Sequence, residues 1–297
     1  MSTIDDLAKI TAIIRVKNRS FSQTKRSEML LRLGIDETLS EICGGGLFIP
    51  SNMLEQARND VHRWLDSGYK IVSLLDADYP SFLTQVHESP ALLFYTGRLR
   101  QSMNSVSIVG SRHANQSALN RAQNIAEFLA HRGYTIISGL AKGIDTAAHQ
   151  SALDADGYTV AVMGTGIDKT YPAENIRLRQ KIEEQNGCIV TQFLPGSPPT
   201  KQSFPMRNVT MSGLSQATIV VTASEYSGTR GQAKRALLHG RNVFLLPDVV
   251  DNTQWGKEML SQPGVYAVTS YDDLYAHLNT IDNDVQLLAS IGKQNSD

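Results

Sequence analysis

From about residue 70 onward, short β-branched runs alternate with helical stretches, and this alternation constrains the fold more than any other feature of the chain. The runs "SVSIVG", "YTIISG", "YTVAVMG" and "ATIVVTA" are typical of strands buried on both faces. The segments between them, such as "LNRAQNIAEFLAHRG" and "TRGQAKRALLHG", carry apolar residues at helical spacing. Strands that alternate with helices predict an α/β fold in which a mostly parallel, doubly wound sheet is covered by helices on both faces.

Residues 1 to about 66 have a helical pattern instead. In "SNMLEQARNDVHRWLDSG", Ser51 is a suitable N-cap and Gly68 a suitable stop for one of these helices, and "CGGGLFIPS" precedes it as a loop. We therefore expect a small helical N-terminal domain over residues 1–68, the α/β domain over 69–280 and a C-terminal tail over 281–297.

The composition excludes several classes of protein. Cys43 and Cys188 are the only cysteines and form no C-x-x-C pair, so we predict neither a disulfide framework nor a zinc site, and no cofactor. The N-terminus "MSTIDDLAKI" lacks the basic end and apolar block of a signal peptide, and no apolar run is long enough to span a membrane. These features predict a cytoplasmic protein without a membrane partner.

The charges are segregated along the chain although the net charge is only -1. Cations dominate residues 98–142 and 201–241, while acids collect after Asp248. Such a chain can form a basic groove for nucleic acid, or it can have two solvated helix faces. The charge pattern alone leaves both interpretations open.

The loops that follow the predicted strands are rich in glycine and small polar residues. They read "GSRHANQS", "SGLAKGID", "GTGIDKTYPAEN" and "SEYSGT". Glycine lets a ligand approach the backbone, and helix N-termini bind anions, so these loops predict a phosphate-binding rim at the carboxyl edge of the sheet. "GTGIDK" lacks the third glycine of a dinucleotide fingerprint, and the sequence contains no P-loop.

Catalytic groups are harder to find. His149 follows two alanines in a predicted helix, which favours a packed or capping histidine. Asp145, Asp168 and Glu174 could supply paired carboxylates for acid–base catalysis, but Asp145 is better placed to order its loop or cap a helix. We therefore expect a protein that is not an enzyme, with no catalytic and no metal-binding residues.

The segment "KQSFPMRNVTMSGLS", residues 201–215, follows a proline-rich loop at the same sheet edge. Lys201 can meet a phosphate, and Arg207 can clamp one bidentately. Phe204 can stack on a base or can staple the following helix to the sheet, and Asn208 can bond a base edge or brace the loop. A ring with two cations beside it favours single-stranded nucleic acid.

These residues resemble the DNA-processing protein A family, also called Smf. The matching stretches include "VSIVGSR", "SGLAKGID", "GTGIDKTYPAEN", "PGSPPTKQSFPMRN" and "GRNVFLLP", and the resemblance covers roughly residues 70 to 270. It implies an extended Rossmann-like domain that binds single-stranded DNA, forms a homodimer and hands the strand to the recombinase RecA in transformation. It also implies that DNA lies against Gly110, Ser111, Arg112, Lys142, Gly164, Gly166, Asn175, Lys201, Phe204, Arg207, Asn208, Ser227 and Gly228.

The chain departs from the family pattern at several positions. Val209 replaces a second arginine, Thr222 replaces a glutamate, and "SGTRGQAKRA" replaces a run that continues Ser-Leu-x-Thr-Ala. The sequence therefore leaves two alternatives to a protein that protects single-stranded DNA and loads RecA. One is a regulatory partner on the same fold, such as an antitoxin or phage-defence component that neutralises a neighbouring toxin. The other is a nucleotide-binding enzyme similar to the phosphoribohydrolases.

Overall fold

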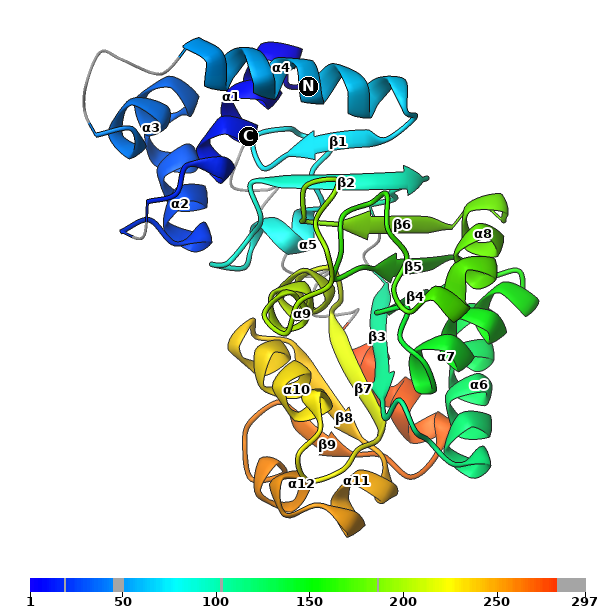
Figure 1. Ribbon diagram of the computed structural model, residues 1–297. Coiled ribbons are helices and arrows are strands. Elements are labelled where there is room, and N and C mark those ends of the chain that lie inside the picture. Colours follow the sequence, from blue (N-terminus) through cyan, green and yellow to red (C-terminus); the bar gives the residue numbers. More distant parts are fainter. Residues whose placement is uncertain (19, 45–50, 102–103, 186, 282–297) are drawn as a thin grey trace, which may run out of the picture.

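The computed structural model describes residues 1–18, 20–44, 51–101, 104–185 and 187–281 (Figure 1). The N-terminal part is helical, as predicted, and contains α1 (Ile4–Arg15), α2 (Gln23–Leu33), α3 (Ile35–Ile42) and α4 (Ser51–Asp66). The first of these begins with a capping box, in which the Thr3 hydroxyl accepts a hydrogen bond from the backbone N–H of Asp6 and the Asp6 carboxylate accepts one from the N–H of Thr3. No helix formed by the described residues is both long and apolar enough to cross a bilayer.

The described residues form one nine-stranded sheet in the order β1-β2-β6-β5-β4-β3-β7-β8-β9. Its strands are β1 (Lys70–Ser73), β2 (Leu92–Gly97), β3 (Ser105–Gly110), β4 (Thr135–Ser138), β5 (Thr159–Val162), β6 (Cys188–Thr191), β7 (Ala217–Thr222), β8 (Asn242–Leu245) and β9 (Val265–Ala267). The seven strands from β3 to β9 pair in parallel, whereas β2 is antiparallel to both β1 and β6. The predicted α/β fold with a mostly parallel sheet is confirmed, and the antiparallel pair β1–β2 extends it at one edge.

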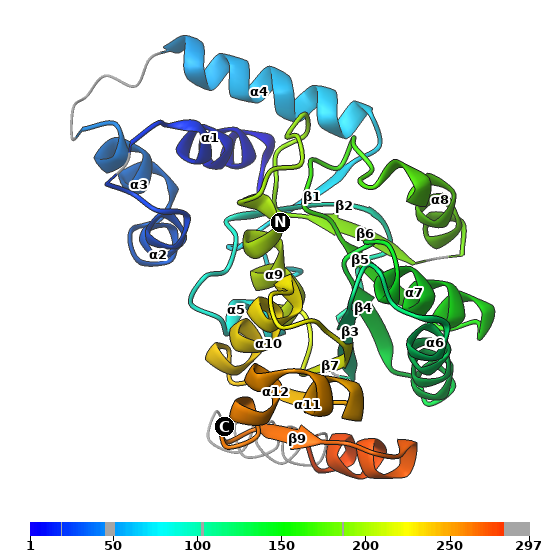
Figure 2. The same cartoon turned by 60° about the horizontal axis from the view of Figure 1, so that its bottom comes forward.

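Helices cover both faces of this sheet (Figures 1 and 2). On one face lie α6 (Gln116–Ala130), α7 (Ile144–Asp154) and α8 (Ile176–Glu184), with a short helix η1 (Ala173–Asn175) before α8. The other face carries α9 (Ser203–Gly213) and α10 (Gly228–Leu238), with α5 (Ser81–Thr84) near α9. The chain continues through α11 (Pro247–Asn252) and α12 (Gln254–Met259), and residues 271–281 form a further helix.

The strand β7 shows why both faces must be covered. Ile219 and Val221 pack in the core under α6 and α7, while Val220 packs in the core under α9 and α10. All three side chains are fully buried. Each contributes roughly 1.5–3 kcal/mol by burial, so neither helical layer can be removed without exposing the sheet.

The N-terminal helices share a core with the sheet. Trp64 of α4 meets Phe94 of β2 edge to face, with ring centroids 5.2 Å apart, and Ile10 and Leu30 belong to the same buried cluster as Ile189 of β6. The helical region therefore packs directly on the sheet, and a domain boundary at residue 68 stays a prediction.

Helix α9 begins at Ser203, so Phe204 lies within this helix rather than before it. Pro205 falls in the first helical turn, where its missing N–H costs no hydrogen bond, so the proline does not delay the helix. The greater part of the predicted loop "CGGGLFIPS" and nearly all of the predicted tail lie outside the described residues.

The order in which successive strands are added to the sheet reverses at β3. From β3 the strands proceed through β4, β5 and β6 on one side, and the chain then crosses back to place β7 on the other side of β3. Loops on the two sides diverge at such a switch point, so a crevice forms beyond the carboxyl ends of β3 and β7.

His149 of α7 is the packed histidine that the sequence favoured. Its side chain is fully buried and its Nδ1 lies 2.7 Å from Thr159 Oγ1. Burial lowers the pKa of His149 from 6.5 to about 3. The folded state therefore keeps this imidazole neutral at pH values where the unfolded chain protonates it.

We expect His149 to make the protein sensitive to acid. Stability from this group is fully present above pH 6.5 and is lost as the pH falls from 6.5 toward about 3, by about 1.4 kcal/mol per pH unit. Denaturant unfolding of His149→Gln between pH 7 and pH 4.5 should show a shallower dependence, by about one proton. His131→Gln, at an exposed position, is the control. Equal slopes for wild type and His149→Gln would contradict this assignment.

Candidate nucleic-acid interface

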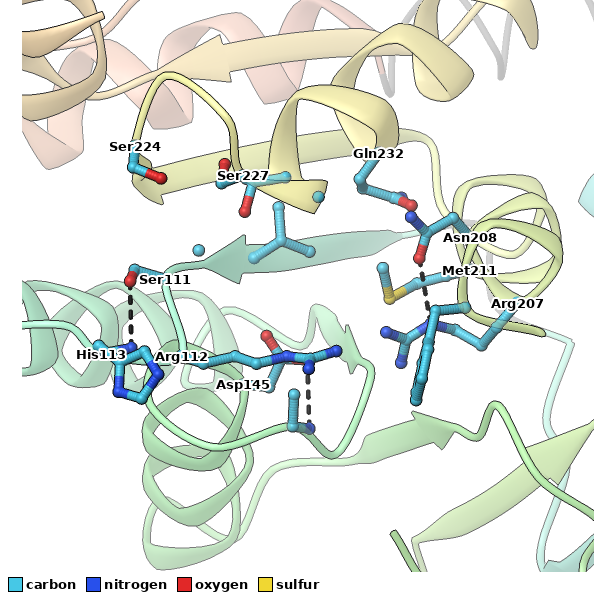
Figure 3. A pocket seen from close by; sticks show the side chains of 16 residues that line it. Ser111, Arg112, His113, Asp145, Arg207, Asn208, Met211, Ser224, Ser227 and Gln232 are labelled. Carbon is cyan, nitrogen blue, oxygen red and sulfur yellow. Dashed lines mark hydrogen bonds between the residues drawn. The ribbon is translucent and has the colours of Figure 1, made fainter. Parts of the chain in front are cut away.

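A cavity of about 390 Å³ occupies the crevice at the switch point (Figure 3). The ends of β3 and β4, the first turns of α9 and the β7–α10 loop all contribute to it. Its lining consists of Val109, Gly110, Ser111, Arg112, His113, Ala141, Asp145, Phe204, Arg207, Asn208, Met211, Ser224, Ser227, Gly228, Thr229 and Gln232. The volume is in the range of sites that bind small ligands or single building blocks of a polymer.

Arg207 forms the buried base of this cavity. Its Nη1 donates to the carbonyl oxygens of Gly139 and Val162, at 2.7 and 2.9 Å, and its Nε donates to Asn208 Oδ1 at 3.1 Å. A side chain at Gly139 would collide with the guanidinium, because an added Cβ would lie 1.7 Å from Nη1. Much of the hydrogen-bonding capacity of Arg207 is thus committed to binding α9 to the ends of β4 and β5.

Asp145 supports the same corner from α7. Its Oδ2 accepts hydrogen bonds from the backbone N–H groups of Gly139 and Ala141, at 3.0 and 3.3 Å, which confirms that it orders its loop. Burial raises the pKa of Asp145, and the charge of Arg207 opposes this rise. Burial also lowers the pKa of Arg207. The two opposite charges compensate one another, which leaves Arg112 as the exposed cation on this wall of the cavity.

Phe204 places a half-buried ring beside that cation. The guanidinium carbon of Arg112 lies 5.1 Å from the ring centroid, and the ring of Tyr171 lies 5.7 Å away on a tilted plane. Gly164 fits closely against the same ring, since an added Cβ would be 3.0 Å from it. The ring is therefore held in place by packing and still reaches the cavity.

The opposite wall is neutral and hydrogen-bonding (Figure 3). Ser227 is the N-cap residue of α10, but its side chain makes no capping bond and its Oγ is buried without a partner among the described residues. The first turn of α10 therefore faces the cavity without a side-chain cap. A helix N-terminus of this kind attracts an anion such as a phosphate.

The structure gathers eight of the predicted site residues around the cavity: Gly110, Ser111, Arg112, Phe204, Arg207, Asn208, Ser227 and Gly228. The other five, Lys142, Gly164, Gly166, Asn175 and Lys201, do not line it. Lys142 is ion-paired with Glu174 at 2.5 Å. The Asn175 amide is buried and donates to Leu140 O and Thr146 Oγ1, both at 2.9 Å. Lys201 is exposed just before α9.

Many cations of the two basic segments lie away from the cavity. Several of their arginines are engaged elsewhere: Arg121 pairs with Asp248, Arg235 with Glu88, and Arg241 donates to the Phe82 carbonyl oxygen. Among the described residues, the arginines that line the cavity are Arg112 and Arg207. Among the described arginines, the positive charge of the cavity lining therefore comes from these two side chains.

Sequence reasoning missed some lining residues, above all Gln232. It lies one helical turn after Gly228, on the same face of α10, and its side chain is buried at 2% exposure. The i, i+4 relation to a predicted site residue was the signal that could have identified it. Among the described residues, no group of three or more His, Cys, Asp or Glu is arranged to hold a metal ion.

The fold and site together define a class. This is a doubly wound α/β protein with a nucleotide-sized, partly cationic cavity at the switch point of its sheet, between a fixed aromatic ring and a helix N-terminus. The family model for DNA recombination-mediator protein A matches residues 70–279, and the chain belongs to that family. The family is one of recombination mediators rather than enzymes, which agrees with the expectation of a protein that is not an enzyme.

Individual relatives support the assignment. The chain is 39% identical over 206 residues to the DNA processing protein DprA of Streptococcus pneumoniae, covering 69% of this chain and 72% of the relative. It is 38% identical over 212 residues to the protein Smf of Synechocystis, where the match spans 69% of this chain and about half (53%) of the relative. The X-ray structure of the pneumococcal DprA superposes with a TM-score of 0.72 at 30% identity, over 93% of this chain and 98% of that one. The DprA structure from Helicobacter pylori shares the fold, with a TM-score of 0.63 at 24% identity over 73% of this chain and 96% of that one.

The Arg207–Asp145 interaction can be tested by a double-mutant cycle. Arg207→Met should lower the free energy of unfolding by about 3 kcal/mol, because it leaves the Asp145 carboxylate buried without its compensating charge. Adding Asp145→Asn should restore part of that loss. Additive effects in urea denaturation would show that the two side chains do not interact.

Proposed function

We propose that this protein binds single-stranded DNA in the switch-point cavity and acts as a recombination mediator. The observation that supports this most directly is the contact of the Arg112 guanidinium with the fixed ring of Phe204, opposite the N-terminus of α10. A single strand offers a phosphate and an unstacked base at each nucleotide, and these are the groups that a cation, a helix N-terminus and an aromatic ring bind. The H. pylori structure was solved to describe a single-stranded DNA binding mode, which supports the same ligand here.

Lys201 extends the proposed path of the strand. It is exposed and lies close in sequence to Phe204, so it can neutralise a phosphate beyond the cavity. Tyr226 is 98% exposed and lies in the loop between the lining residues Ser224 and Ser227. An exposed ring at the rim offers a second surface for a neighbouring base.

The finer functional assignments are part of the same proposal. The protein would act in the cytoplasm as a homodimer, protect single-stranded DNA and load RecA onto it. Sedimentation in solution would test the dimer, and RecA filament nucleation on strands coated with single-strand-binding protein would test loading. The regulatory-partner alternative, with a neighbouring toxin, stays a prediction from the sequence departures.

Binding should depend on salt through the cations at the site. Fluorescence anisotropy with a labelled single-stranded oligonucleotide should give a linear decrease of log affinity with log salt concentration. The slope should shrink by about 0.7 for each phosphate contact that is removed. We expect Arg112→Ala and Lys201→Ala each to weaken binding and to reduce the slope by about that amount.

Two exposed cations away from the cavity provide matched controls. Arg98 follows β2 and Lys181 lies on α8, and neither residue lines the cavity. The control variants are Arg98→Ala and Lys181→Ala. Both variants should bind as the wild type does. Binding that does not change with salt, or the same loss in all four variants, would contradict the proposed site.

The ring of Phe204 should contribute affinity that does not depend on salt. Phe204→Leu keeps an apolar side chain but removes the stacking surface, so binding should weaken roughly 5- to 100-fold with an unchanged salt slope. Phe21→Leu is the matched control, because that ring also faces a cation, with Lys25 Nζ 4.7 Å from its centroid. Full affinity of Phe204→Leu would show that no base stacks there.

A further inference from the structure

Gln232 is a buried amide that the protein leaves without a partner. Its side chain lines the cavity at 2% exposure, and neither its Nε2 nor its Oε1 forms a hydrogen bond with any described residue. A buried polar group without a partner destabilises the folded state, because it has lost its hydrogen bonds to water. That cost indicates a group that is paired only when the cavity is filled.

The neighbouring side chains show what Gln232 faces. Figure 3 shows the amides of Gln232 and Asn208 turned toward each other from α10 and α9. Asn208 is already oriented, because its Oδ1 accepts the hydrogen bond from Arg207 Nε. The unpartnered Ser227 Oγ lies five residues before Gln232, at the N-cap of α10, and lines the same cavity. This wall therefore presents neutral donors and acceptors, while the facing wall presents Arg112 and the ring of Phe204.

The groups that line the cavity match the parts of a nucleotide. The cation and the helix N-terminus suit a phosphate, and the ring suits the face of a base. The remaining part of a nucleotide is the edge of its base, which carries adjacent hydrogen-bond donors and acceptors. A primary amide carries one donor and one acceptor side by side, and with them Asn or Gln pairs with N7 and N6 of adenine.

We propose that Gln232 contacts the edge of the base in the cavity and makes the site prefer adenine. The inference rests on the proposed function and goes beyond it, because binding by phosphate contacts and stacking alone tolerates any sequence. Gln232 supplies a donor and an acceptor to one base, so the strand is held in a preferred position and not only by its backbone.

The test compares ratios of affinities. Dissociation constants are measured by anisotropy at one salt concentration for oligo-dA, oligo-dC and an oligonucleotide of abasic sites. The proteins are wild type, Gln232→Leu and Gln232→Glu, with Gln123→Leu on the exposed face of α6 as control. Stacking within the free oligonucleotide cancels when the ratio for a variant is divided by that for wild type.

We expect wild type to prefer dA over the abasic strand, and Gln232→Leu to reduce that preference by about fivefold or more. Gln232→Glu removes the donor for N7 of adenine and keeps an acceptor for the amino groups of both adenine and cytosine. Adenine therefore loses one of two contacts while cytosine keeps its one, so the dA-to-dC preference should fall. The added negative charge lowers affinity for every strand and therefore does not affect this ratio. Ratios within twofold of wild type in both variants would overturn the proposal.

Thermal unfolding separates base contact from a structural role. Gln232→Leu conserves volume and removes an unpartnered amide, so its Tm without DNA should equal or exceed that of wild type. A Tm several degrees lower would mean that the amide has partners within the protein, and the proposal would fail.

The outcomes also distinguish this inference from the proposed function. If wild type binds in a salt-dependent manner but the ratios are unchanged, only the role of Gln232 is wrong. If no oligonucleotide binds, the proposed function fails, and so does the proposed contact of Gln232 with an adenine of a bound strand. Titration with free dAMP then tests the other source of the same chemistry: binding that Gln232→Leu abolishes would assign the contact to a free nucleotide, and no binding would leave Gln232 without a ligand.

Discussion

The site depends on the hydrogen bonds and the positive charge of the buried Arg207 guanidinium. It connects α9 to the carbonyl groups at the ends of β4 and β5, and its charge compensates the buried carboxylate of Asp145. Asp145 in turn holds the loop after β4 through two backbone N–H groups. Because α9 carries both Phe204 and Asn208, this one buried side chain positions the aromatic ring and the amide that line the cavity. The absence of a side chain at Gly139 is the condition for that arrangement.

Local pattern was sufficient for the elements that repeat a simple period. The buried strands, the flanking helices and the gathering of Gly110, Arg112 and Ser227 at one edge follow from apolar runs and from the rule that parallel strands share a carboxyl edge. The pattern failed where tertiary contacts decide. The pattern did not show that Phe204 lies inside α9, which packs on the sheet and begins at Ser203. Nothing in the sequence distinguishes an arginine that bonds carbonyl groups from one that meets a phosphate, so the burial of Arg207 required the structure.

Two kinds of group in the cavity differ in the chemistry of recognition that they can provide. In the proposed complex, Arg112 and the first turn of α10 act on charge, which every nucleotide carries, whereas Gln232, Asn208 and Ser227 act through directed hydrogen bonds. Charge attracts over a distance but screens with salt, and hydrogen bonds act only in contact. In this proposal, affinity and selectivity depend on different groups and can change independently.

The shared core of the N-terminal helices and the sheet has a consequence for how such chains can be assembled. The family model begins at residue 70, shortly after α4, yet Trp64 packs on Phe94 of the matched region, and Ile10 and Leu30 belong to the buried cluster that contains both. The part of the sheet formed by β1, β2 and β6 therefore provides an apolar surface on which the N-terminal helical region packs. Any lineage that exchanged this helical region for another segment would need a replacement of complementary shape and hydrophobicity, which restricts the recombination of domains more than the boundary in the sequence suggests.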